Sequence, residues 1–434
     1  MSSSKTQPVQ ASNNRLSNFF NQFPAIPYLA KWILITALLG ILIGTASAFF
    51  LFSLQWATQI REQNLWLIAL LPIAGLLIGL LYHYYGKDIE GGNNLLIDTI
   101  HQPAQKIPFK MTVFIYLGTI ATHLFGGSAG REGTALQMAG GIADQLTKPL
   151  RLSDEDRKTL IIAAVAAGFG AVFGTPLAGA IFAMEFFFVG KLRYNSIFPA
   201  FAAAILANQV THLWHAEHTV YHIPSVPPTK LLNLGYAVIA GIVFGICAAT
   251  FSKTLRFSGK FFKNRIKYPP FRPLVGGAVL ALIIYSMGTT QYIGLGIPTI
   301  VAAFEQQMPV YAFAIKIALT VITLAAGFKG GEVTPLFFIG ATLGSALAVV
   351  LPLPVALLAG MGFVAVFAGA TNTPLACTLM ALELFGSQCG VYVAVACIVA
   401  YFLSGHTGIY GRQIIGEAKN PRWSKDQNKL INDL

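Results

Sequence analysis

Charged side chains are scarce in this chain of 434 residues. Only 11% of the residues are Asp, Glu, Lys or Arg, whereas soluble domains carry about 25%. Three stretches, residues 32–60, 273–304 and 333–382, contain none of them, and the mean hydropathy is +0.63. Because a helix needs roughly 20 apolar residues to cross a bilayer core, the chain has room for about ten or more membrane segments. This composition excludes a soluble globular protein and predicts an all-α polytopic membrane protein.

Acidic residues are fewer than basic ones, with 17 Asp and Glu against 29 Lys and Arg and a net charge of +12. Residues 253–272 hold seven Lys or Arg and no acid, whereas residues 211–229 hold no Lys or Arg at all. Cytoplasmic loops of membrane proteins are enriched in Lys and Arg. We therefore expect residues 253–272 in the cytoplasm and residues 211–229 outside. The basic excess then reflects membrane topology, and nucleic acid is not an expected partner.

The sequence also lacks an extended hydrophilic domain. Residues 1–28 form a polar amino tail, residues 29–412 a single transmembrane domain, and residues 413–434 a short carboxyl tail without a soluble regulatory domain. We expect both tails in the cytoplasm and the protein in the cell (inner) membrane. The cysteines lie in apolar segments without CxxC spacing, which indicates small buried side chains, and no cofactor or metal is expected. They are Cys247, Cys377, Cys389 and Cys397.

What the sequence does contain is an internal repeat. Residues 174–187 (GTPLAGAIFAMEFF) match residues 372–385 (NTPLACTLMALELF) at seven of fourteen positions. A second block near residue 130 matches one 200 residues later and pairs Glu132 with Glu332. Two blocks in the same order at nearly the same offset indicate homologous halves, about 30–210 and 230–410. Because the first half starts from the cytoplasm and the second from outside, the halves have opposite orientations.

Each repeat places glycines and a glutamate at the start of an apolar helical run. Inverted repeats put transport sites near the middle of the bilayer, at interrupted helices, and the chain is interrupted near residues 170–176 and 369–374. Unpaired N–H groups at a helix start attract anions, and Thr134 and Thr334 could add hydroxyl donors.

The two repeat-matched glutamates would lie at these same helix starts. As a carboxylate, Glu132 or Glu332 competes with a bound anion. As a neutral acid it can swing away, which couples anion movement to proton movement. The alternative is that both glutamates only stabilise the first turns of their helices.

Four short motifs lie in order along the chain: GNNL at 92–95, GREG at 130–133, GEVTP at 331–335, and Tyr410. They resemble, respectively, GSGIP, GREGP, GIFIP and the inner-gate tyrosine of the CLC family of chloride channels and chloride/proton antiporters. The resemblance covers about residues 30–412. It implies the CLC inverted-repeat fold, with half-helices meeting at the midplane, and a homodimer with one pore per subunit in membrane lipid.

The departures from the chloride-type motifs resemble the fluoride/proton antiporter branch of that family. Asn93 replaces a serine, GEVTP replaces GIFIP, and Phe186 stands where chloride exchangers have an internal proton-transfer glutamate. The resemblance implies that Glu132 is the gating, proton-carrying glutamate and Glu332 the central pore glutamate. It also implies an anion site that comprises Asn93, Gly133, Gly331, Val333, Thr334, Phe338 and Tyr410. Leu96 stands where the branch has a second pore phenylalanine.

We therefore expect a proton-coupled anion antiporter, not an enzyme, that exports fluoride in exchange for protons. A chloride channel or chloride/proton exchanger of the same fold is the alternative, because amide, hydroxyl and backbone donors bind chloride as well as fluoride.

Three further features allow other interpretations. The stretch GGSAG at 126–130 matches the GxSxG motif of serine hydrolases, with His123 as the nearby base, but the expected strand–turn–helix setting is absent. The predicted outside loop is crowded with His212, His215, His218, His222 and Glu217. Metal ligation is possible at this spacing, but neither H-E-x-x-H nor H-x-x-E-H is present, so a solvated loop is favoured over a metal site. The repeat-matched Glu185 and Glu383 are expected to receive backbone N–H groups of a neighbouring helix, with proton relay as the alternative.

Overall fold

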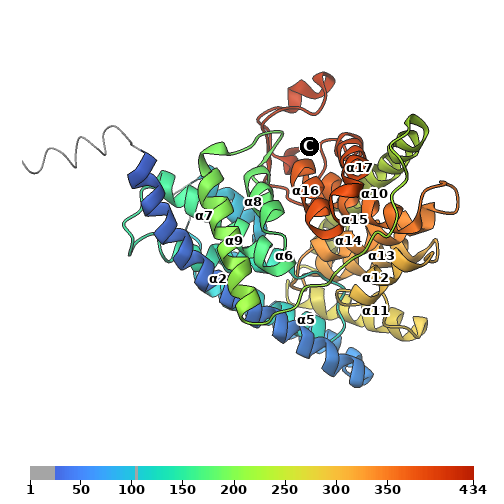
Figure 1. The fold of residues 1–434 in the computed structure, drawn as a ribbon. Coiled ribbons are helices and arrows are strands. Elements are labelled where there is room, and N and C mark those ends of the chain that lie inside the picture. Colours follow the sequence, from blue (N-terminus) through green and yellow to red (C-terminus); the bar gives the residue numbers. More distant parts are fainter. Residues whose placement is uncertain (1–24, 103–105) are drawn as a thin grey trace, which may run out of the picture.

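The computed structural model describes residues 25–102 and 106–434, and this part of the chain is almost entirely helical (Figure 1). Residues 1–24 of the predicted amino tail, which was expected to span residues 1–28, lie outside the described residues. The first described helix begins at Ala25, before the predicted end of that tail at residue 28. In Figure 1 the first half of the chain, blue to green, lies beside the second half, yellow to red.

The helices of the first half recur in the same order in the second half. The first set is α2 (Ala25–Gln63), α3 (Leu71–Tyr85), α4 (Asn93–His101), α5 (Lys110–Leu124), α6 (Glu132–Asp144), α7 (Asp154–Phe173), α8 (Pro176–Glu185) and α9 (Ile197–Leu213). The second set is α10 (Leu231–Arg265), α11 (Phe271–Met287), α12 (Ile297–Glu305), α13 (Ala312–Ala326), α14 (Val333–Leu347), α15 (Val355–Thr371), α16 (Pro374–Phe385) and α17 (Gly390–Leu403). The repeat predicted from the sequence is therefore a repeat of whole helices.

Few of the helices cross a membrane in one piece. In the described ranges, four helical segments are long and apolar enough to do so: Ile26–Gln63, Leu65–Tyr85, Tyr194–Leu213 and Leu231–Arg265. A further seven apolar helices have only 10 to 17 residues. The chain length allows about ten full spans. The described residues instead form fewer full spans and many short helices. Short helices leave backbone ends inside the protein, where a polar site can form.

The predicted interruptions fall between α7 and α8 and between α15 and α16. α7 ends at Gly174 with φ +75°, and α15 ends at Asn372 with φ +63°, both left-handed conformations that stop a helix. Pro176 and Pro374 then occupy the first position of the next helix, where a missing N–H group is harmless. The two repeats therefore break their helices by the same local chemistry.

Each of the two helices that begin with proline, α8 and α16, caps the amino end of the other. The Glu383 carboxylate on α16 accepts the backbone N–H groups of Leu177 and Ala178 at 3.0 and 2.7 Å. The Glu185 carboxylate on α8 accepts those of Leu375 and Ala376 at 3.3 and 2.9 Å. Each carboxylate thus satisfies N–H groups that have no partner within the helix. The prediction that these glutamates receive backbone N–H groups of a neighbouring helix is confirmed.

Replacing either capping glutamate by alanine should weaken the joint between the two repeats. We expect Glu185→Ala or Glu383→Ala to lower the free energy of unfolding by about 1–3 kcal/mol, because buried N–H groups lose a charged acceptor. Glutamine at the same positions keeps an acceptor and should cost less. Thermal denaturation of the purified detergent-solubilised variants, followed by size-exclusion chromatography, measures the difference. Alanine variants as stable as the wild type would contradict the capping role.

The segment after α17 folds back onto the helices instead of extending away. Strand β2 (Ile414–Ile415) pairs in parallel with strand β1 (Phe188–Val189), which follows α8. The buried Lys419 ammonium donates to the carbonyls of Tyr401 and Gly405, at 2.7 Å each, at the end of α17. Residues 413–434 of this segment were expected as a short carboxyl tail. Its backbone contacts make it part of the folded domain.

Candidate functional site

The glycine-rich loops of the two repeats meet directly before α6 and α14. Gly130 and Gly331 form an antiparallel bridge, with N···O distances of 2.6 and 2.8 Å in the two directions. A Cβ atom on Gly330 would lie 2.5 Å from the Cβ of Ala129, and one on Gly331 would lie 2.7 Å from the backbone nitrogen of Gly133. The close approach of the loops therefore requires glycine, which accounts for the GREG and GGE patterns. The contact brings the starts of α6 and α14 together.

The Glu132 carboxylate occupies the start of the helix from the opposite repeat. Oε2 accepts the backbone N–H of Thr334 at 3.0 Å, and the Thr334 hydroxyl lies 2.6 Å from both carboxylate oxygens. Thr334 is the second residue of α14, so this N–H group has no acceptor within the helix. The Glu132 side chain is completely buried. A protein carboxylate thus fills an anion site built from a helix start.

Arg131 lies between this carboxylate and the neighbouring cavity. Its backbone N–H donates to Glu132 Oε2 at 3.2 Å, and its Nε lies 3.4 Å from Glu132 Oε1. The guanidinium is 13% exposed, whereas the carboxylate is not exposed at all. Arg131 therefore adds positive charge beside the Glu132 carboxylate, which stays at the start of α14.

Three other predicted site residues carry buried polar atoms without a hydrogen-bond partner among the described residues. These atoms are Asn93 Oδ1, Glu332 Oε2 and the Tyr410 hydroxyl. Gly133 makes room for Asn93, because a Cβ atom on Gly133 would lie 2.8 Å from Asn93 Nδ2 and 3.5 Å from Glu332 Oε2. Buried polar atoms are rarely left unpaired in folded proteins. The closeness of Asn93 and Glu332 to the Gly133 position indicates a place for an ion, a proton or water.

The remaining predicted site residues differ in how close they lie to Glu132. Gly331 and Val333 lie at the start of α14, beside the Glu132 carboxylate. The Phe338 ring packs instead against Tyr292 and Lys316, with 5.0 Å from its centroid to Lys316 Nζ.

Thr134 and its repeat partner Thr334 make different hydrogen bonds. Its hydroxyl lies 2.7 Å from the hydroxyl of Thr119 on α5, so it is already engaged within the first repeat. The expectation that Thr134 adds a hydroxyl donor to the anion stays a prediction, because either hydroxyl of this pair can be the donor. Leu96 contacts the Gly140 position on α6. Phe186 meets the Tyr410 ring at a centroid distance of 4.8 Å.

Two cavities approach the site from different sides. One of about 630 Å³ is lined by Arg131 together with Arg61, Glu62, Glu217 and His218. Because residues 211–229 are expected outside, we call it the outer cavity. The other, of about 900 Å³, is lined by Glu332 together with Lys residues of 253–272, and we call it the inner cavity. Arg131, which contacts Glu132, thus lines the outer cavity, and Glu332 lines the inner one.

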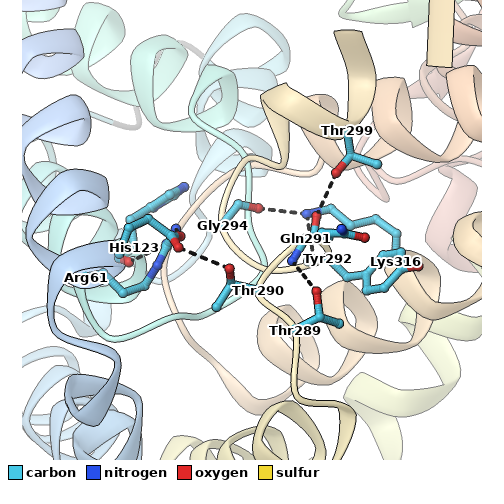
Figure 2. Close-up of polar contacts among 10 residues, drawn as sticks. Arg61, His123, Thr289, Thr290, Gln291, Tyr292, Gly294, Thr299 and Lys316 are labelled. Carbon is cyan, nitrogen blue, oxygen red and sulfur yellow. Dashed lines mark hydrogen bonds and ion pairs between the residues drawn. The ribbon is translucent and has the colours of Figure 1, made fainter. Parts of the chain in front are cut away.

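The side chains of Arg61, His123 and Lys316 are buried and belong to one network of polar contacts (Figure 2). The sequence analysis did not recognise this network. Arg61 donates to the His123 carbonyl at 2.9 Å, and Lys316 donates to the carbonyls of Tyr292 and Gly294 at 3.0 and 2.7 Å. Gly294 N–H in turn donates to the carbonyl of Gly127, in the loop before α6, at 3.1 Å. This network holds the loop that leads to Glu132. Its contacts join distant segments, so no local pattern could reveal it.

The GxSxG stretch has no hydrolase geometry. The Ser128 hydroxyl lies 3.0 Å from the Thr320 hydroxyl and 3.3 Å from the Tyr292 carbonyl. The two ring nitrogens of His123 face the carbonyls of Thr119 and Ala129 at 2.8 and 3.1 Å. A catalytic base must lie within hydrogen-bond reach of its nucleophile, and His123 is not paired with Ser128.

The histidine-rich loop does not gather a ligand set. His212 and His218 lie 5.4 Å apart between ring centroids, and His218 Nε2 lies 2.9 Å from the Ala171 carbonyl. In the described part of the chain, no three His, Cys, Asp or Glu side chains come together as metal ligands.

The fold and the site together are those of a membrane transport protein in which the glycine-rich loops of two repeats meet beside two glutamates. The chain belongs to the CLC family, because residues 74–405 match the family model described as voltage gated chloride channel. This is a family of transport proteins and not of enzymes. The predicted family is confirmed.

Known proteins of different sequence identity to this chain support its membership of the family. A chloride/fluoride channel protein of Pseudomonas syringae pv. tomato is 50% identical over 415 residues, which cover 94% of this chain and 92% of the relative. The H(+)/Cl(-) exchange transporter ClcA of Vibrio vulnificus is 26% identical over 81% of each chain. A solved structure of a CLC-type fluoride/proton antiporter superposes with a TM-score of 0.86 at 35% identity, covering 89% of this chain and 98% of that one. The predicted all-α inverted-repeat fold is confirmed.

The Tyr410 hydroxyl should contribute modestly to anion binding. In Tyr410→Phe the backbone N–H groups and the Thr334 hydroxyl remain, so we expect less than about a tenfold loss of apparent anion affinity. The concentration dependence of anion efflux from proteoliposomes measures it. A loss of a hundredfold or more would mean that this hydroxyl is a principal ligand.

Proposed function

We propose that the protein exports fluoride across the cell membrane in exchange for protons. The observation that carries the proposal is the Glu132 carboxylate, which occupies the anion site at the start of α14 by accepting the Thr334 N–H and hydroxyl. A transported anion can bind there only when this carboxylate leaves. Protonation removes its charge and releases it. Anion binding and proton binding are thereby linked at one site.

The two cavities supply the two directions of movement. Fluoride enters from the inner cavity, which reaches Glu332, and takes the place of Glu132 at the Thr334 N–H. Glu132 accepts a proton from the side of the outer cavity, which Arg131 lines. After fluoride has left outward, Glu132 returns and passes its proton to Glu332, which releases it into the inner cavity. Glu132 thus carries its proton while fluoride occupies its place at the Thr334 N–H, and Glu332 receives that proton after fluoride has left.

The donor set suits a small, strongly hydrated anion. The amide of Asn93, the hydroxyls of Thr334 and Tyr410, and the backbone N–H groups at Gly133 and Val333 are all neutral donors. Gly331 positions this donor set, because its own N–H donates to the Gly130 carbonyl. Phe338 belongs to the proposed site by resemblance, with its ring against Tyr292 and Lys316. The relatives and the solved structure named for fluoride support fluoride as the substrate. The related chloride/proton exchanger makes chloride the second candidate.

The proposal includes the setting of the protein. The basic stretch 253–272 supports an orientation with both ends of the chain in the cytoplasm of a cell whose inner membrane holds the protein. We further propose a homodimer surrounded by membrane lipid, with one anion site in each subunit. Residues 29–412 would form the transmembrane domain of each subunit.

Efflux from proteoliposomes loaded with fluoride or chloride tests the function. Ion-selective electrodes follow the anion while a pH electrode follows the external medium. Rapid fluoride efflux with proton uptake, and little chloride movement, is the expected result. Comparable or faster chloride movement would instead assign the protein to chloride transport. Fluoride efflux without proton uptake would reject antiport in favour of a channel.

A further inference from the structure

The Glu132 carboxylate is completely buried, so a proton from the outside needs a path to it. Its neighbour Arg131 is 13% exposed and lines the outer cavity. A guanidinium stays protonated in proteins, so Arg131 cannot pass a proton on. The proton therefore travels either through water alone or by way of a titratable group in the wall of the outer cavity.

Three side chains in the wall of this cavity can change their protonation state near the pH of a cell: Glu62, Glu217 and His218. The Glu62 carboxylate is engaged on both oxygens, with Arg61 Nη2 2.5 Å from Oε1 and the Thr290 hydroxyl 3.0 Å from Oε2. Glu217 is exposed. His218 is only partly exposed, and histidine is the side chain that gains and loses a proton near neutral pH. His218 is therefore the group to consider as a relay.

The two ring nitrogens of His218 have different surroundings. Nε2 lies 2.9 Å from the backbone carbonyl of Ala171 on α7. Because a carbonyl oxygen only accepts, Nε2 carries the hydrogen of the neutral ring and Nδ1 holds a lone pair. Nδ1 is buried and has no hydrogen-bond partner among the described residues. One nitrogen is thus committed to the backbone, and the other is free to accept a proton.

The loop that carries this ring is held against the helices of the first repeat. A Cβ atom on Gly174, at the end of α7, would lie 2.9 Å from His218 Cγ, so the ring packs directly over the break between α7 and α8. Ala216, two residues earlier in the loop, is buried in a cluster with Ala135 of α6, the helix that begins at Glu132. The position of His218 relative to the start of α6 is therefore fixed by packing.

The charges around His218 favour a short-lived imidazolium. Burial lowers the pKa of His218 from its usual value, the Ala171 carbonyl opposes this effect, and Arg131 and His212 lower the pKa further. A proton on this ring is repelled by Arg131, whereas the Glu132 carboxylate attracts it. The charged and titratable groups around the ring are Arg131 before α6, His212 on α9, Glu217 in the same loop, and Arg61 and Glu62 on α2 across the cavity.

We propose that His218 relays protons between the outer cavity and Glu132. The inference rests on the proposed transport function and names the residue that serves its outer proton path. Nδ1 takes a proton from an acid in the outer solution, which leaves as its conjugate base. The imidazolium then gives this proton, through water in the cavity, to the Glu132 carboxylate, and the ring returns to its neutral form. The same transfers run in reverse, so the relay serves either orientation of the protein in a vesicle.

A substitution at His218 and one at His222 form a matched pair. His218→Gln removes the titrating ring and keeps a side-chain N–H for the Ala171 carbonyl. His222 lies in the same loop, is exposed and does not line the outer cavity, so His222→Gln is the control. If the glutamine at position 218 does not yield folded protein, His218→Asn provides the same test.

The measurement is the initial rate of fluoride efflux with proton uptake from proteoliposomes, in dilute buffer at equal pH on both sides. We expect His218→Gln to lose about tenfold or more in rate, because water alone replaces a positioned acid–base group. His222→Gln should keep the wild-type rate. The proton-to-fluoride ratio should be unchanged in both variants, because each cycle still requires the proton on Glu132.

Added imidazole separates proton transfer from packing. Free imidazole is small enough to enter a cavity of about 630 Å³ and carry the proton in place of the lost ring. We expect it to raise the rate of His218→Gln in proportion to its concentration, and to leave the wild type and His222→Gln unchanged. Pyrazole, a ring of the same size that stays neutral near neutral pH, should not raise the rate.

Three results would overturn the relay. They are a His218→Gln rate equal to that of His222→Gln, a slow rate that imidazole does not raise, and an equal rise with pyrazole. The last two would assign His218 a packing role. If the wild type itself moves no fluoride with protons, the proposed transport function fails instead.

Discussion

Glu132→Gln should abolish proton coupling. A glutamine amide can accept hydrogen bonds from Thr334, as the carboxylate does at 3.0 Å from the backbone nitrogen, but it cannot take up and release a proton. We expect proton uptake during fluoride efflux to fall by about 100-fold or more, the scale of a lost acid–base group. Any fluoride movement that remains should no longer depend on the pH gradient. Parallel recordings with a fluoride electrode and a pH electrode measure both quantities.

A second glutamate that accepts helix N–H groups provides the control for this substitution. Glu383→Gln changes a carboxylate that accepts N–H groups from Leu177 and Ala178, at a helix end outside the two cavities. It should retain the wild-type ratio of protons to fluoride. Proton uptake that persists at the wild-type ratio in Glu132→Gln would reject Glu132 as the proton carrier. Loss of coupling in both variants would point to a general effect of disturbed packing.

Glu332→Gln should slow the coupled exchange strongly without removing the anion site. Glu332 is the carboxylate at the start of α14 that lines the inner cavity, and its Oε2 has no hydrogen-bond partner among the described residues. In our mechanism it takes the proton from Glu132 and releases it inward. Without that acceptor we expect the rate of fluoride/proton exchange to fall by about 10- to 100-fold. The Thr334 donors remain, so apparent fluoride affinity should change much less.

Glu90→Gln is the matched control, because Glu90 lines the same cavity but lies outside α14. It should exchange at close to the wild-type rate. A Glu332→Gln variant that exchanges as fast as Glu90→Gln would exclude Glu332 from the proton path. A slow variant whose proton-to-fluoride ratio is unchanged is the expected result, since each completed cycle still requires the proton on Glu132.

Local sequence patterns predicted the parts of the site that depend on short stretches of chain. Glycine followed by glutamate and an apolar run indicated the helix starts at Glu132 and Val333. The repeated TPLA stretches indicated the proline-started helices α8 and α16. These features are encoded locally, because φ freedom at glycine, the missing N–H of proline and helical periodicity act over a few residues.

Contacts between the repeats depend on the tertiary structure. Thr134 and Thr334 match in sequence, yet Thr334 holds Glu132 whereas Thr134 pairs with Thr119. The partner of Glu132 lies 202 positions away, and only the folded backbone selects it. Lys316 likewise finds its acceptors in the carbonyls of Tyr292 and Gly294, which no side-chain pattern records.

Composition and repeated motifs indicate the membrane class, the two homologous halves and the two glutamates, because both follow directly from the order of residues. That Glu132 occupies the helix start of the opposite repeat, and that Asn432 lines the inner cavity, depends on the folded backbone. The donors in these contacts are mostly backbone N–H groups. Every residue except proline has one, so only its position in the fold makes it part of a site.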